Sequence, residues 1–191
     1  MKNLIKLSFA MILAAILFTA CSTEDNPLGP TDSGNNNGGG EPIVIKTPRY
    51  MHIESISVRH FPKNKPNGDT WDWDPFSSTE RKPDVEVVLQ RSGNYLPAFW
   101  SDRRKNANYT STYVFTQPAS EYDGELPYDV PYGQKWKVSL VDHDGFANDN
   151  DQMGSVSFKP TSIYGQDNAT NFDKTITSGD IKVRLRGAWI Y

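Results

Sequence analysis

Two segments of the sequence gather side-chain oxygens that suit a hard cation. Their acids and amides include Asp69, Asp72, Asp74 and Asp84 in the first segment, and Asp142, Asp144, Asp149, Asn150 and Asp151 in the second. Calcium takes roughly 6–8 oxygen ligands in flexible geometry, and loops rich in Asp and Asn supply them. The other explanation is that Asp, Asn and Gly are good turn formers. The residue types alone leave both explanations open.

Several other kinds of site are excluded by residue type and spacing. An EF-hand loop that starts at Asp149 would need a glutamate where Pro160 stands. The histidines are His52, His60 and His143, and no Gly-x-Ser-x-Gly, His-Glu-x-x-His or P-loop pattern accompanies them. Lysine and arginine number 20 against 23 acids, so no basic surplus is available for a nucleic acid. We therefore expect neither an enzyme nor a nucleic-acid-binding protein.

Tryptophans beside the first acidic segment suggest a second kind of chemistry. Trp71, Trp73, Trp100 and several tyrosines lie in or near predicted loops, where their aromatic faces could stack on sugar rings. Aromatic side chains bury about 150–250 Å² each, so packing in a core is the alternative for each of them. Trp136 alternates with Val138 and Leu140 and is predicted to lie in the core.

Short alternating runs separated by turn residues must position these side chains, since helical periodicity is absent. The predicted strands span residues 53–58, 84–89, 95–100, 113–116, 135–140, 156–158 and 181–186. A phase slip near Ser55 predicts a bulge. Asp142 and Asp144 start on one face of the chain and His143 on the other, because alternate residues of a strand point to opposite sides. The pattern predicts an all-β, antiparallel sandwich with one wet face on each sheet.

The first 20 residues are typical of a secretory signal. Lys2 and Lys6 precede an apolar stretch at residues 7–18. This stretch is shorter than the roughly 20 residues of a transmembrane helix. Residues 17–21, Leu-Phe-Thr-Ala-Cys, resemble the lipobox of bacterial lipoproteins, although Phe18 is an unusual residue there. The resemblance implies that Cys21 carries a lipid. A membrane-spanning anchor and a plain signal peptide are the alternatives.

A polar tether follows the cysteine. Residues 22–48 are rich in Gly, Asn and Pro and contain almost nothing that can be buried. Residues 22–25, Ser-Thr-Glu-Asp, resemble the export signal of outer-membrane lipoproteins that face the cell surface, with the periplasmic face as the alternative. The expected organisation is a signal peptide at 1–20, a lipidated cysteine and tether at 21–48, and a folded domain at 49–191.

Both acidic segments resemble the calcium loops of the C2 domain family. Residues 140–144, Leu-Val-Asp-His-Asp, and 150–154, Asn-Asp-Gln-Met-Gly, resemble the third loop, and residues 68–72 with 83–87 resemble the first. The resemblance covers roughly residues 50–160. It implies an eight-stranded, C2-like β-sandwich with calcium between the two loops at one end. The implied calcium ligands are Asp72, Asp84, Asp142, Asp144 and Asp151.

Departures from the family pattern leave some of these ligands open. The first loop is longer than in the family, and the third holds one extra residue before its last aspartate. The alternatives are Asp69 and Asp74 in place of Asp72, and Asp149 and Asn150 in place of Asp151. In addition, Val85-Glu86 stands where the family begins its strand with Pro-Tyr.

Together these features predict a surface-anchored bacterial lipoprotein with a C2-like, calcium-binding module. Its acidic loops would contact a lipid headgroup, a glycan or a protein partner, while the lipid on Cys21 holds it at the membrane. The alternatives are a calcium-independent glycan-binding lipoprotein that uses Trp71 and Trp73, and a structural subunit of an outer-membrane complex.

The substitution Cys21→Ala tests the anchor. Without the thiol no lipid can be attached, and multiple acyl chains give the lasting attachment. We expect Cys21→Ala to abolish surface display, measured by labelling intact cells. Display that survives the substitution would show that the chain is held by other means.

Overall fold

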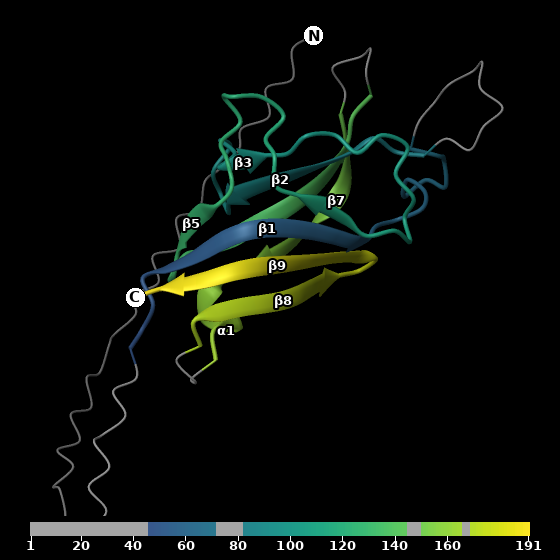
Figure 1. The fold of residues 1–191 in the computed structure, drawn as a ribbon. Coiled ribbons are helices and arrows are strands. Elements are labelled where there is room, and N and C mark those ends of the chain that lie inside the picture. Colours follow the sequence, from purple (N-terminus) through teal and green to yellow (C-terminus); the bar gives the residue numbers. More distant parts are fainter. Residues whose placement is uncertain (1–45, 72–81, 145–149, 166–168) are drawn as a thin grey trace, which may run out of the picture. The chain divides into compact units, whose positions relative to one another are not determined.

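The computed structural model describes residues 46–71, 82–144, 150–165 and 169–191. These residues form an all-β domain with a single short helix (Figure 1). The strands are β1 (Tyr50–His60), β2 (Val85–Arg91), β3 (Phe99–Trp100), β4 (Tyr113–Phe115), β5 (Tyr128–Pro131), β6 (Trp136–Asp142), β7 (Asp151–Phe158), β8 (Asn171–Ser178) and β9 (Ile181–Ile190). The helix α1 spans Pro160–Ile163.

The strands form two sheets, in which every pairing of strands is antiparallel. One sheet has the order β4-β1-β9-β8, with β5 also paired to β1, and the other has the order β3-β2-β6-β7. The predicted all-β antiparallel sandwich is therefore confirmed. The predicted bulge is also present, since the pairing of β1 with β9 shifts register between Ile53 and Ser55.

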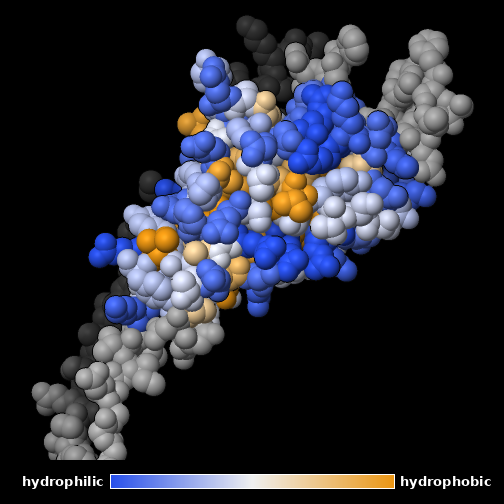
Figure 2. Space-filling model, viewed as in Figure 1, coloured by the Kyte–Doolittle hydropathy of each residue, from blue (hydrophilic) through white to orange (hydrophobic). Residues whose placement is uncertain are grey.

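Alternation along the strands places one face of each in a shared core. In β2 the inward residues are Val85, Val87 and Leu89, each fully buried. Trp136 in β6 is 4% exposed and belongs to the same cluster, as its alternation predicted. On the face seen in Figure 2 the apolar residues form separate patches among hydrophilic ones.

The predicted strand at 95–100 is shorter in the structure. Only Phe99 and Trp100 are paired, while Tyr95 and Leu96 are exposed. Pro97 has no N–H group to donate to a neighbouring strand, so the ladder starts after it. The strands β5 and β8 were not predicted.

The first described residues of the chain are held against the domain. Pro48 is buried, and the N–H of Arg49 donates to the Ile190 carbonyl at 2.7 Å. The signal peptide, Cys21 and residues 22–45 lie outside the described residues. Within the part of the chain that the structure describes, no helix has the length and apolar character to cross a membrane.

Gly187 lies where β9 passes closest to β1. A Cβ atom added to Gly187 would stand 1.9 Å from the His52 carbonyl oxygen, and backbone cannot yield there without breaking the pairing of β1 with β9. We expect Gly187→Ala to lower the free energy of unfolding by roughly 3 kcal/mol or more, measured by chemical denaturation. Gly133→Ala is the matched control, because nothing lies within 4 Å of its added Cβ. Equal stability of the two variants would contradict this account of the contact.

Candidate functional site

Four of the five predicted calcium ligands meet at one end of the four-stranded sheet. In the register of the sheet Asp142, the last residue of β6, pairs with Val85 of β2 and with Asp151 of β7. Asp84 directly precedes β2, and Asp144 follows Asp142 by two residues. We call Asp84, Asp142, Asp144 and Asp151 the acidic cluster. The fifth predicted ligand, Asp72, lies outside the described residues, as do Asp74 and Asp149.

Two members of the acidic cluster hold neighbouring backbone. Asp142 is fully buried, and its Oδ1 accepts a hydrogen bond from the N–H of Asp84 at 2.8 Å. Asp84 Oδ1 accepts the N–H of Asn106 at 2.8 Å, and its Oδ2 lies 3.7 Å from a guanidinium nitrogen of Arg103. The Asp84 carbonyl accepts the N–H of His143 at 3.0 Å. These carboxylates therefore fix the chain where β2 and β6 meet the loops.

A lysine supplies positive charge to the acidic cluster from another part of the sequence. The Lys65 ammonium group pairs with Asp151 Oδ2, and its side chain is only 24% exposed. A turn presents Lys65: its N–H donates to the Asp69 carbonyl at 2.8 Å, and its own carbonyl accepts the N–H of Gly68 at 2.9 Å. Gly68 has a φ of +92°, which favours glycine.

The charges of the cluster perturb two of its groups in a consistent way. Burial lowers the pKa of Lys65, but the hydrogen bond and charge of Asp151, with the charges of Asp144 and Asp142, outweigh it and raise this pKa above its ordinary value. Burial raises the pKa of Asp144; Lys65 opposes this rise, and Asp151 adds to it. The cluster thus holds more negative charge than Lys65 neutralises.

In the described residues, the chain's own donors already engage several of the oxygens that a calcium ion would need. Calcium needs roughly 6–8 oxygen ligands, whereas Asp142 Oδ1 and Asp84 Oδ1 already accept backbone N–H groups and Asp151 pairs with an ammonium group. Among the described residues, no group of three or more His, Cys, Asp or Glu side chains is placed to hold a metal ion. Lys65, which no sequence spacing connected to these acids, pairs with Asp151, one of the carboxylates that the ion would need.

A second buried carboxylate lies beside the acidic cluster. Glu86 points to the outer face of β2, yet it is only 5% exposed. Its Oε2 accepts the indole N–H of Trp100 at 2.7 Å, and its Oε1 accepts the Arg103 Nε–H at 3.3 Å. The Nδ1 atom of His143 lies 3.3 Å from the same Oε1. His143 therefore projects away from its flanking aspartates, as the alternation predicted, but it lies against Glu86 and is only partly exposed.

The structure corrects the role suggested for Trp71. This residue is 2% exposed, and its indole N–H donates to the Pro62 carbonyl at 2.8 Å. Trp71 is therefore a core residue and cannot stack on a ligand. Trp73 lies outside the described residues.

No protein-family model matches the chain, and no curated protein sequence matches it significantly. Among solved structures, the chain is similar to a two-domain C2 fragment of extended synaptotagmin 2, with 15% identity, a TM-score of 0.43 and coverage of 86% of this chain and 49% of that one. It is also similar to a C2 domain of a plant extended synaptotagmin 1, with 12% identity, a TM-score of 0.34 and coverage of 74% and 99%. A human GIVD cytosolic phospholipase A2 has 13% identity, a TM-score of 0.40 and coverage of 74% and 17%.

The chain thus spans 49% of the extended synaptotagmin 2 fragment and 17% of the phospholipase. Similarity at these identities and TM-scores is a similarity in the arrangement of strands, and it assigns no function to this chain.

The raised pKa of Asp144 predicts a pH dependence of stability. The folded state binds the Asp144 proton more tightly than the unfolded chain does, so this group's contribution to stability falls as the pH rises through its folded pKa. Asp144→Asn removes the ionised form. We expect the variant to melt at a higher temperature than the wild type at pH 7, with the difference disappearing at about pH 3, below the ordinary aspartate pKa.

The exposed Asp180, in the turn between β8 and β9, provides the matched control. We expect Asp180→Asn to melt as the wild type does at both pH values. An Asp144→Asn variant less stable than the wild type at pH 7 would mean that the ionised carboxylate helps to hold the fold.

Proposed function

We propose that the chain is a lipid-anchored bacterial surface protein whose folded domain is a non-catalytic binding module that works without calcium. The lipobox-like residues at 17–21 and the polar tether at 22–48 support the anchor and the display of the domain at a distance from the membrane. The location we propose is the outer membrane, on the side that faces the cell surface, as the residues after Cys21 indicate.

The single observation that carries this proposal is the Lys65 ammonium group in the acidic cluster. In a calcium site a divalent ion offsets the repulsion among the carboxylates. Here Lys65 on Asp151 and Arg103 near Asp84 take that role with positive charges that belong to the chain. The end of the sandwich is therefore held together at any calcium concentration.

The hydrogen bonds at this end of the sandwich support a binding rather than a catalytic role. Asp142 and Asp84 accept backbone N–H groups, and Glu86 accepts the indole N–H of Trp100. A general acid or base must reach a substrate, whereas these carboxylates hold other parts of the chain. The geometry favours a scaffold that presents a surface to a partner.

A calcium-dependent module is the second candidate, favoured by the convergence of Asp84, Asp142, Asp144 and Asp151 at one end of the sheet. In that case the ion would have to displace Lys65 from Asp151. Calcium binding therefore remains a prediction of the sequence, and the two candidates differ in what happens when the ion is added or removed.

Thermal melting of the full chain with calcium and with a chelator tests the proposal. A bound ion at 100 times its dissociation constant adds about 2.7 kcal/mol of stability, and weak extracellular sites bind at about 10⁻⁴–10⁻³ M. We expect the wild type to melt at the same temperature in millimolar calcium and in chelator.

Lys65→Met is the matched variant in this experiment. It removes the ammonium group but keeps an unbranched apolar stem, so it leaves Asp151 without the positive charge that neutralises it. We expect Lys65→Met to melt at a lower temperature than the wild type and to regain stability when calcium is added. A wild type that calcium stabilises and chelator destabilises would overturn the proposal in favour of the second candidate.

A further inference from the structure

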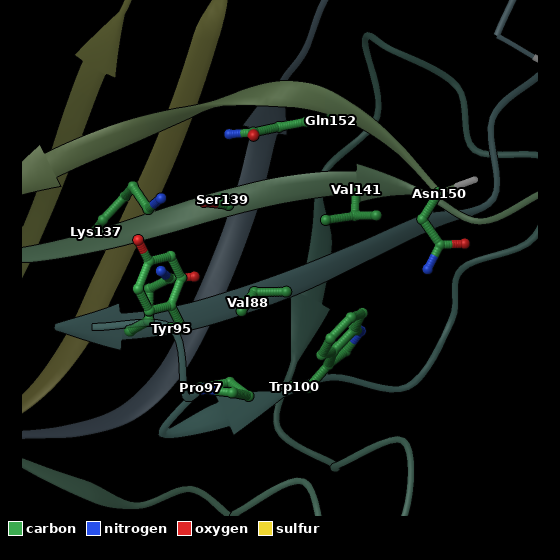
Figure 3. A pocket seen from close by; sticks show the side chains of 10 residues that line it. Val88, Tyr95, Pro97, Trp100, Lys137, Ser139, Val141, Asn150 and Gln152 are labelled. Atoms are coloured by element: carbon green, nitrogen blue, oxygen red, sulfur yellow. The ribbon is translucent and has the colours of Figure 1, made fainter. Parts of the chain in front are cut away.

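A groove crosses the outer face of the four-stranded sheet. It has a volume of about 250 Å³, and its lining comes from β2, β3, β6, β7 and the residues just before β3 and β7 (Figure 3). We call it the sheet-face groove. It is separate from the acidic cluster, since none of the four cluster residues lines it.

The floor of the sheet-face groove contains a buried hydroxyl group that lacks a partner. Val88 and Ser139 face each other in the register of β2 and β6, and they are only 6% and 4% exposed although both point to the outer side of the sheet. In the part of the chain that the structure describes, no hydrogen-bond partner is found for Ser139 Oγ. Buried polar groups are almost always hydrogen-bonded. The floor of the groove therefore offers a hydroxyl group to a ligand that can donate or accept.

Two aromatic residues stand on either side of this floor. In Figure 3 Tyr95 and Trp100 lie on opposite sides of Val88. Tyr95 is 97% exposed. The Trp100 ring is held in place, because its N–H donates to the buried Glu86 at 2.7 Å. A ring that is fixed before binding loses little entropy when a ligand stacks on it.

The polar groups around the floor suit a neutral ligand. Gln90, Asn150 and Gln152 line the groove, and each amide both donates and accepts hydrogen bonds. Lys137 is the one charged side chain among the described residues that line it. Recognition of a phosphate or of an acidic polymer uses several cations or a bidentate arginine, and this lining has neither.

From these features we propose that the sheet-face groove binds a neutral saccharide. The apolar faces of a sugar ring would pack on Tyr95 and Trp100, and its hydroxyl groups would pair with Ser139 and the amides of the rim. This inference rests on the proposed role as a binding module and names its ligand. It moves the glycan from the loop tryptophans, of which Trp71 is buried, to the open face of the sheet.

The test is affinity electrophoresis of the full chain in detergent through gels that contain a single polysaccharide. The neutral probes are xyloglucan, glucomannan, starch and xylan, and the anionic probe is polygalacturonate, all in the presence of chelator. We expect at least one neutral polysaccharide to retard the wild type. Tyr95→Ala and Ser139→Ala should each weaken that binding about fivefold or more, since each removes a ring or hydroxyl contact.

Two control variants separate the groove from general stickiness and from charge. Tyr122→Ala removes a tyrosine that is 88% exposed but does not line the groove, and it should bind as the wild type does. Lys137→Met removes the charge of the groove and shows whether any retardation by the anionic probe depends on that charge. Thermal melting of each variant confirms that it is folded.

Three outcomes would overturn the inference. These are no retardation by any neutral polysaccharide, equal retardation of the wild type and folded Tyr95→Ala, and retardation by polygalacturonate that Lys137→Met abolishes. None of these outcomes decides the proposed function, which has its own tests. Melting with calcium and with chelator measures calcium independence, and the Cys21→Ala display assay tests the anchor.

Discussion

The end of this sandwich depends on the neutralisation of carboxylates that the strand register brings together. Because β2, β6 and β7 are antiparallel neighbours, the residues at their ends meet, and in this chain those residues are acids. Like charges so close together oppose folding unless something offsets them. Lys65, carried by a turn between β1 and Trp71, supplies the offset from a distant part of the sequence. The same segment continues to Trp71, which is buried in the core.

Glu86 joins this end of the sandwich to the open face of the sheet. One of its oxygens lies close to His143, which stands between two residues of the acidic cluster, and the other accepts the N–H of Trp100. Trp100 in turn lines the sheet-face groove. The hydrogen bond from Trp100 to the buried Glu86 carboxylate keeps the tryptophan ring in one orientation. Removing it would leave the indole N–H without its acceptor, so the groove depends on a residue that does not line it.

Much of the fold followed from the alternation of residues, and the reason is physical. The side chains of a half-buried strand must alternate, so β2, β6 and β9 stand out in the sequence. The strand β8 does not, because it lies at the edge of its sheet and most of its residues are exposed. Its pairing is instead marked by the ion pair of Asp173 with Arg184 on β9, a contact between strands that no local pattern reveals.

The candidate site was predictable in part. The resemblance to the calcium loops of C2 domains named Asp84, Asp142 and Asp151, and acids placed at the ends of neighbouring strands converge once the sheet forms. The partner of Asp151 was not predicted, because Lys65 is a loop residue far along the chain with no periodic relation to it. The sheet-face groove was missed because Ser139 and Val88 are ordinary strand residues whose exposure depends on what stands beside them.

The balance of charge at the acidic cluster bears on which ligands can approach the sheet-face groove. Among the described residues, Lys65 on Asp151 and Arg103 between Asp84 and Glu86 are the two cations beside the four carboxylates of the acidic cluster, so a negative charge remains. The raised pKa of Asp144 reflects this charge in part, since Asp151 and Asp84 add to the effect of burial. A residual negative field repels anions from this end of the sandwich. An anionic ligand would therefore meet repulsion near the groove and only Lys137 within it. A neutral ligand meets neither, and it gains from rings and hydroxyl groups whose contributions do not depend on charge.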